Sequence, residues 1–141
     1  MHCFERAGLR REVKVCEAYR LREMARSGAG MAFKPNDHKR AFIVAADAFA
    51  DCGAAATGKE QLQYYHNSAD CYFRGGDDLK AADAHLKAQE FELSAKRYRK
   101  AGRFDRTLHV LDDHGTVIPR ETVEELQTVC RLFYCSRNNS Q

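Results

Sequence analysis

Apolar residues recur every three or four positions along most of this chain, with polar residues between them. An α-helix completes one turn in about 3.6 residues, so this spacing gathers the apolar side chains on one helix face. Each stripe therefore predicts an amphipathic helix that buries one face against a neighbour. The predicted stripes contain, in chain order, Val15, Ala18, Tyr19, Leu21 and Ala25; Phe42, Ala45, Ala46, Phe49 and Cys52; Leu62, Tyr65, Ala69 and Tyr72; Leu79, Ala82 and Leu86; Phe91, Ala95 and Tyr98; Phe104, Leu108 and Leu111; and Val123, Leu126, Cys130 and Phe133.

Glycines mark where these helices are expected to end. Glycine adopts the left-handed backbone conformation that closes many helices. Pro119 suits the first turn of a helix, where a backbone N–H has no partner, and so predicts the start of the last helix. A bulky residue is followed four positions later by glycine in "FERAG" (4–8), "FADCG" (49–53), "YFRGG" (72–76), "YRKAG" (98–102) and "LDDHG" (111–115), and each glycine is predicted to end a helix.

The pattern predicts an all-α fold forming a single domain over residues 1–141. The segment 27–36, with its glycines and Pro35, is predicted to be a loop between two helical blocks. Each helix buries only one stripe, so neighbours must stack in sequence, as in a helical solenoid. A compact bundle is the alternative. The shortness of several helices favours a solenoid of about seven or eight antiparallel helices.

The amino-acid composition is consistent with a helical protein and excludes few classes of function. The 141 residues include only two prolines, and 44% are hydrophobic. The net charge of +3 comes from 23 basic and 20 acidic residues, which is too balanced to indicate nucleic acid or an anionic membrane. The chain has neither a secretory signal pattern nor an apolar run of about 18 residues. We therefore expect an intracellular protein, cytoplasmic or nuclear, without a membrane partner.

Six cysteines are present, and most fall within the helical pattern at positions expected in the core. In a reducing compartment cysteines of this kind are free thiols that behave as small hydrophobic residues. The cysteines interpreted in this way are Cys3, Cys16, Cys52, Cys71, Cys130 and Cys135.

The stretch "GAAATGKE", residues 53–60, matches most of a phosphate-binding loop, G-x-x-x-x-G-K-[ST]. The last position carries Glu60 where a hydroxyl would hold Mg²⁺, and the preceding segment has the spacing of a helix instead of a strand. A structural interpretation fits better: Gly53 ends one helix, and Thr57 with Glu60 forms a capping box that starts the next. We expect no nucleotide or other cofactor and no small-molecule substrate.

Metal and nucleophile patterns are equally weak. The nearest pairs of ligand-type residues are separated by five positions, which places their side chains about 140° apart around a helix. No cysteine has a visible base or positive setting that would make it a nucleophile. We expect no metal site and no catalytic residue. The pairs are His66 with Cys71, Cys130 with Cys135, and His109 with His114.

The densest charge feature is "KRYRKAGRFDR", residues 96–106. Basic residues interleaved with Tyr98 and Phe104 could contact phosphates or RNA. The two aromatic residues also belong to core stripes, and cations before Gly102 complement the helix dipole, so a solvated surface explains the same residues. The candidate contacts to an anionic partner are Lys96, Arg97, Arg99, Lys100, Arg103 and Arg106.

The endings "SADCYFRGG" (68–76) and "SAKRYRKAG" (94–102) resemble tetratricopeptide-type helical repeats, although the intervals vary and no repeat-ending proline is present. More closely, the succession "CFERAG", "EAYRLREMAR", "AFIVAADAFADCG", these two endings and "VCRLFY" is similar to the helical region that follows the motor in large fungal UvrD-type helicase-like proteins of the tetratricopeptide-and-ankyrin-repeat family. The resemblance implies a tetratricopeptide-like solenoid that is part of a larger protein. It carries over no ATPase residue.

We therefore expect a non-catalytic helical-repeat scaffold that mediates protein–protein or interdomain contacts. The alternative is a nucleic-acid-binding accessory module that uses the basic cluster 96–106. The two differ in partner chemistry, and binding to nucleic acid across a range of salt distinguishes them.

Overall fold

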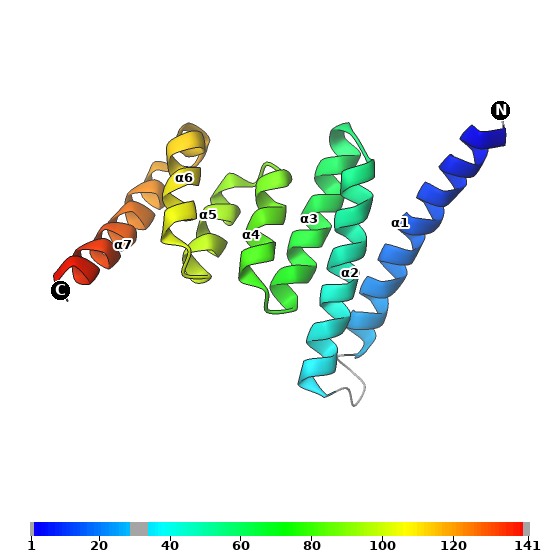
Figure 1. The fold of residues 1–141 in the computed structure, drawn as a ribbon, viewed down its shortest axis with the longest axis horizontal. Coiled ribbons are helices and arrows are strands. Elements are labelled where there is room, and N and C mark those ends of the chain that lie inside the picture. Colours follow the sequence, from blue (N-terminus) through cyan, green and yellow to red (C-terminus); the bar gives the residue numbers. More distant parts are fainter. Residues whose placement is uncertain (1, 29–33, 140–141) are drawn as a thin grey trace.

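The computed structural model describes residues 2–28 and 34–139, and within them every regular element is a helix (Figure 1). The expected all-α fold is confirmed. The described elements are α1 (His2–Gly28), α2 (Pro35–Ala55), α3 (Gly58–Arg74), α4 (Asp78–Lys87), α5 (Phe91–Lys100), α6 (Phe104–His114), the 3-10 turn η1 (Gly115–Val117) and α7 (Arg120–Asn139).

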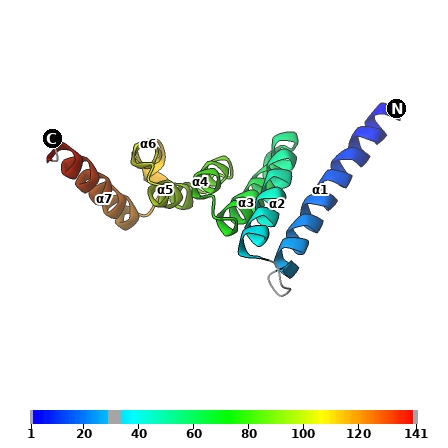
Figure 2. The same ribbon diagram turned by 60° about the horizontal axis from the view of Figure 1, so that its bottom comes forward.

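The helices lie side by side in chain order, from α1 at one end of an elongated molecule to α7 at the other (Figures 1 and 2). Each α-helix packs mainly on the next helix in sequence, and α5 also contacts α7. Packing between sequence neighbours is what one apolar stripe per helix requires, because each stripe can be covered by the helices directly before and after it.

Two clusters of buried side chains form the core. The first joins α1, α2, α3 and one face of α4 around Phe49, and the second joins α4, α5, α6 and α7 around Tyr98. The predicted stripe of α2 is buried in full. The stripe of α7 is buried at Leu126 and Cys130, whereas its last member, Phe133, stacks on Phe104 of α6 but is 37% exposed.

Of the five glycines predicted to end helices in the left-handed conformation, two are confirmed, two lie inside helices, and Gly115 ends α6 without that conformation, with φ of −61°. Gly76 and Gly102 have φ of +84° and +77° and close α3 and α5. Gly8 and Gly53 instead lie inside α1 and α2. At Gly53 the reason is packing: a Cβ there would lie 3.0 Å from ring atoms of Tyr65, so this glycine permits α2 and α3 to approach.

A further helix end has no glycine. Gln89 lies between α4 and α5 with φ of +61°, and the N–H of Glu90 donates to the carbonyl of His85 at 2.8 Å. The same closing bond joins Arg103 N–H to Tyr98 O at the next corner. Glycine spacing alone missed this corner because a residue with a side chain occupies the left-handed position.

Gly102→Ala is expected to lower the free energy of unfolding by about 1 kcal/mol, because alanine is strained at a positive φ. Gly115→Ala is the matched control: Gly115 follows α6 with φ of −61°, and at both positions an added Cβ would meet nothing within 4 Å. Urea unfolding of the two variants measures the difference. Equal losses would show that backbone conformation is not the cause.

Gln89→Gly is expected to raise the free energy of unfolding by about 0.5–1 kcal/mol. The substitution removes the strain of a left-handed side-chain residue, and the greater freedom of glycine in the unfolded chain offsets part of that gain. Thermal unfolding measures the change. A lower melting temperature would contradict the assigned conformation of residue 89.

The predicted loop at 27–36 is too wide at both ends. Helix α1 continues to Gly28, and α2 begins at Pro35, which suits a first helical turn. Residues 29–33 of this segment lie outside the described residues. The last helix begins at Arg120, one residue after the predicted start.

Candidate functional site

One set of contacts occurs twice along the row of helices. In the α2–α3 pair, the Ser68 hydroxyl donates to the carbonyl of Ala46 at 2.8 Å, and the Tyr72 hydroxyl donates to the Asp47 carboxylate. Ser68 is fully buried. These contacts connect the middle of α2 to the last two turns of α3.

The α4–α5 pair repeats this set. The Ser94 hydroxyl donates to the carbonyl of Ala82 at 2.9 Å, and the Tyr98 hydroxyl donates to the Asp83 carboxylate. The sequence signal is Ala-Ala-Asp at 45–47 and 81–83, paired with Ser-Ala-x-x-Tyr at 68–72 and 94–98. Sequence reasoning found the glycines after these segments but missed the serine and aspartate.

A cation accompanies each tyrosine. Lys80 Nζ lies 5.7 Å from the ring centroid of Tyr72, and the Arg106 guanidinium carbon lies 5.9 Å from that of Tyr98. Each cation follows its tyrosine by eight residues and comes from the first turn of the next helix. Lys80 and Arg106 are exposed, so each helix pair places one cation at the same structural position on the surface.

The buried hydroxyls of these tyrosines remain protonated at neutral pH. Burial, followed by the hydrogen bond to Asp83, raises the pKa of Tyr98 to about 12, and burial and Asp47 raise the pKa of Tyr72 in the same way. Protonated hydroxyls donate to the two carboxylates, so these pairs are structural contacts and not acid–base groups at this pH.

Most cations of the predicted basic cluster have an acidic partner within the chain. Lys96 pairs with Glu92 at 3.0 Å, Arg103 with Asp105 at 3.3 Å, Arg106 with Asp83 at 3.6 Å and Lys100 with Asp78 at 3.9 Å. The chain therefore compensates much of the charge that the sequence alone displays as a basic run. The partners of Lys100 and Arg106 lie on α4 and are distant in sequence from the cluster.

The two remaining cations differ. The Arg97 guanidinium lies 3.8 Å from the ring centroid of Phe73, where Lys100 also approaches at 5.0 Å, and Arg97 Nε is buried. Arg99 is exposed and forms no ion pair within the described part of the chain. The cations of the cluster thus contact several different side chains of the chain itself and do not form one free basic surface.

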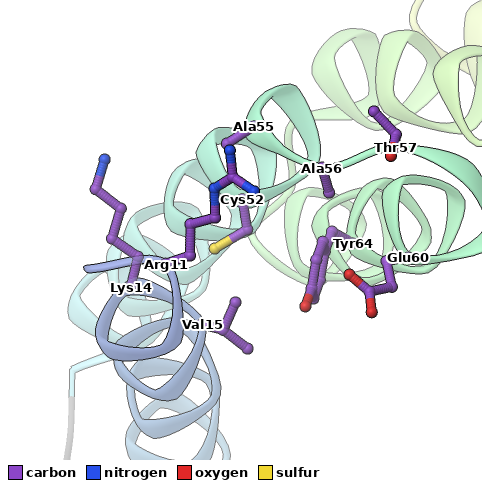
Figure 3. Close-up of a pocket in the computed structure, with 9 residues that line it drawn as sticks. All are labelled: Arg11, Lys14, Val15, Cys52, Ala55, Ala56, Thr57, Glu60 and Tyr64. Carbon is purple, nitrogen blue, oxygen red and sulfur yellow. The ribbon is translucent and has the colours of Figure 1, made fainter. Parts of the chain in front are cut away.

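The stretch "GAAATGKE" lies at the corner between α2 and α3, beside a cavity of about 190 Å³ (Figure 3). The expected helix before it is confirmed as α2. Arg11 extends from α1 across the end of α2, whereas Glu60 and Tyr64 lie together on α3. Lys59 lines a different hollow, with His66 and Glu90, so the lysine and the carboxylate of this stretch do not share a site.

The predicted capping box does not form. Thr57 occupies the N-cap position of α3, but its side chain makes no capping hydrogen bond. Gly58 follows with φ of +66°, so the backbone turns between Thr57 and the first regular helical turn. The corner is held instead by Gln61, whose Nε2 donates to the carbonyl of Gly53 at 3.0 Å.

The described cysteines are free thiols, as the sequence predicts. Cys52, Cys71 and Cys130 are buried, and burial raises the pKa of Cys71 to about 11. Cys16 and Cys135 are exposed. Among the residues that the structure describes, no three His, Cys, Asp or Glu side chains are grouped so that they could hold a metal ion.

Two histidines share one carboxylate at the α4–α5 corner. His66 Nδ1 lies 2.9 Å from Glu90, and His85 Nδ1 lies 3.1 Å from the same carboxylate. His85 is buried, and His66 is half exposed. Burial lowers the pKa of His85, and the hydrogen bond to Glu90 opposes this effect. Arg97 and His66 lower the pKa further.

The stability of the chain is expected to fall as the pH drops below about 6.5, because His85 binds a proton more weakly in the folded state than in the unfolded state. The contribution of His85 is complete above that pH and is lost on acidification, by at most about 1.4 kcal/mol per pH unit. Chemical unfolding of wild type and His85→Asn between about pH 7 and pH 5 measures it.

His85→Asn should lose less stability over this range than the wild type does. His109→Asn is the control, because His109 lies in the solvent beside Asp113 and should keep the wild-type pH dependence. The same pH slope in all three proteins would contradict the assignment to His85.

No family model, curated protein or solved structure matches this chain. Across the described residues, no helix has both the length and the apolar character needed to span a membrane.

Proposed function

We propose that this chain is a non-catalytic, tetratricopeptide-like α-solenoid of antiparallel helices that binds or positions a partner protein or a neighbouring domain. The observation that carries the proposal is the contact set shared by the α2–α3 and α4–α5 pairs, in which Ser68 and Ser94 bond to a carbonyl and Tyr72 and Tyr98 bond to a carboxylate. Equivalent contacts in successive helix pairs are typical of repeat proteins, which use their long exposed sides to bind partners.

The surface proposed for the partner is the side that carries Lys80 and Arg106. Both cations lie over tyrosine rings whose hydroxyls are fixed by aspartates, so their positions are held before any partner binds. Pre-positioned side chains lose less conformational entropy on binding than mobile ones. The resemblance to helicase-like proteins makes a helicase-like motor domain a candidate partner, with the chain acting beside the motor as a fragment of a larger protein.

The proposal is tested by immobilising the full chain, identifying retained proteins by cross-linking and mass spectrometry, and measuring each purified partner by calorimetry. Lys80→Glu combined with Arg106→Glu should raise the Kd for a true partner at least about tenfold, which corresponds to about 1.4 kcal/mol of binding free energy. Lys59→Glu with Arg131→Glu is the control, because both residues are exposed and lie outside this surface. Equal affinity of both double variants would contradict the proposed surface.

The alternative, a nucleic-acid-binding accessory module, rests on Arg99, which is exposed and, within the described chain, has neither an acidic partner nor the aromatic contact that Arg97 makes with Phe73. A filter-binding assay with single-stranded RNA across a range of salt tests it. Retention of RNA by the wild-type chain at about 150 mM salt would favour a nucleic-acid partner over a protein partner if Arg99→Ala abolishes it and Lys96→Ala does not. Absence of retention at low salt would eliminate this alternative.

A further inference from the structure

The outer face of α1, defined by Leu9, Val13, Cys16, Arg20 and Met24, is apolar and uncovered in the described chain. These positions recur every three or four residues and therefore lie on one side of the helix. Leu9 is 59% exposed, Val13 61% and Met24 54%. Helix α1 lies at the end of the row of helices (Figure 1) and packs mainly on α2.

The opposite side of α1 supplies its core contacts. Ala18 and Ala25 are fully buried against the first core cluster, so the outer face is not the face that holds α1 on α2. Arg20 is held on the outer face, where its Nη2 donates to Glu17 at 3.1 Å and its Nη1 lies 3.2 Å from Met24 Sδ. Glu12 lines the same surface, together with Leu9 and Val13.

We propose that the outer face of α1 pairs with the same face of a second copy, in an antiparallel contact with Cys16 at the twofold axis. In this arrangement residue i of one copy lies opposite residue 32 − i of the other. Glu12 then lies opposite Arg20 of the second copy, and the twofold axis creates this pair twice. By the same rule Val13 lies opposite Tyr19 of the second copy, and Leu9 lies opposite Glu23, beside Met24.

The charges on this face favour a second copy of the chain, paired in this antiparallel register. A parallel pairing would place Glu12 against Glu12 and Arg20 against Arg20, and like charges across an interface are costly. An antiparallel pairing shifted by three residues would place Glu12 against Glu17 instead. Of these three arrangements, only the register centred on Cys16 opposes Glu12 to a cation, so the face is complementary to itself when it is reversed.

This inference goes beyond the proposed function, because its partner is the chain itself and its surface is not the one that carries Lys80 and Arg106. A contact made by one helix from each copy is small, so we expect a reversible dimer with a Kd on the order of micromolar.

Analytical ultracentrifugation of the full chain under reducing conditions, at concentrations up to about 100 µM, tests the pairing. Glu12→Arg and Arg20→Glu should each raise the dimer Kd at least about tenfold, because each places like charges opposite one another twice. An equimolar mixture of the two variants should restore dimers, because every arginine at these positions in the first variant then faces a glutamate of the second. Asp112→Arg, an exposed charge reversal on α6, is the matched control.

A cysteine cross-link locates the contact. With Cys3 and Cys135 replaced by serine, a short bis-maleimide should link two copies through Cys16, which is exposed, while Cys52, Cys71 and Cys130 are buried. The converse protein, Cys16→Ser with Cys135 retained, should give no such product. Circular dichroism checks that each variant is folded.

A wild-type chain that stays monomeric at about 100 µM, or a mixture of variants that fails to restore dimers, overturns the inference. Either result leaves the proposed function standing if a partner protein still binds in a manner that depends on Lys80 and Arg106. Conversely, a dimer formed through Cys16 with no partner protein found would support the inference and contradict the proposed function.

Discussion

Phe49→Ala is expected to lower the free energy of unfolding by about 3–5 kcal/mol, the largest loss anticipated from a single substitution in this chain. Phe49 is fully buried in the first core cluster. The Tyr19 ring meets it edge to face with centroids 5.0 Å apart, and the Arg22 guanidinium lies 5.3 Å from its centre. Removing the ring leaves a cavity where α1, α2 and α3 meet, because the surrounding helices relax only partly.

Urea unfolding monitored by circular dichroism measures the loss, and Phe133→Ala is the matched control. Phe133 stacks on Phe104 with centroids 4.2 Å apart but is 37% exposed, so its removal should cost no more than about 1.5 kcal/mol. Losses of similar size in the two variants would contradict the placement of Phe49 at the centre of the core.

The second large effect concerns Gly53, where Gly53→Ala is expected to cost about 1–3 kcal/mol. Alanine normally stabilises the interior of a helix relative to glycine, so a loss at this position requires a specific cause. The cause is contact: the added Cβ would lie 3.0 Å from three atoms of the Tyr65 ring, which is buried between α2 and α3. One helix must then move away from the other.

A double-mutant cycle with Tyr65→Leu separates this cause from a helix-ending role. If Gly53 is a contact residue, the cost of Gly53→Ala should largely disappear once the ring is removed, and the two substitutions should couple by about 1 kcal/mol or more. A glycine needed for a left-handed helix end would show the same cost with either residue at position 65. Additive losses would therefore restore the interpretation that the sequence first suggested.

The local structure of this chain follows closely from its sequence. The stripe from Phe42 to Cys52 predicts α2 and its buried face correctly, because helical periodicity is a property of neighbouring residues. Gly76 and Gly102 are correctly predicted as left-handed helix ends for the same local reason. Gln89 adopts that conformation as well, but nothing in its own side chain indicates it.

The candidate surfaces were predicted less well, because their properties depend on partners far away in sequence. The basic run from Lys96 to Arg106 suggests an exposed positive surface, yet Asp78 and Asp83 on the preceding helix pair with two of its members. Lys80 and Arg106 were not recognised as equivalent, since the tyrosines and aspartates that position them come from separate helices.

The sequence alone is enough to predict that the chain is helical, which faces of its helices are apolar and where several of them end. The packing of the helices is needed to see that Gly53 is a contact between α2 and α3, that Tyr72 and Tyr98 make the same hydrogen bond in two helix pairs, and that no described residue covers the outer face of α1. The two kinds of property differ in how far apart in sequence their determinants lie. Helix periodicity and turn geometry are set within a few residues, whereas packing and charge pairing depend on which helices are brought together.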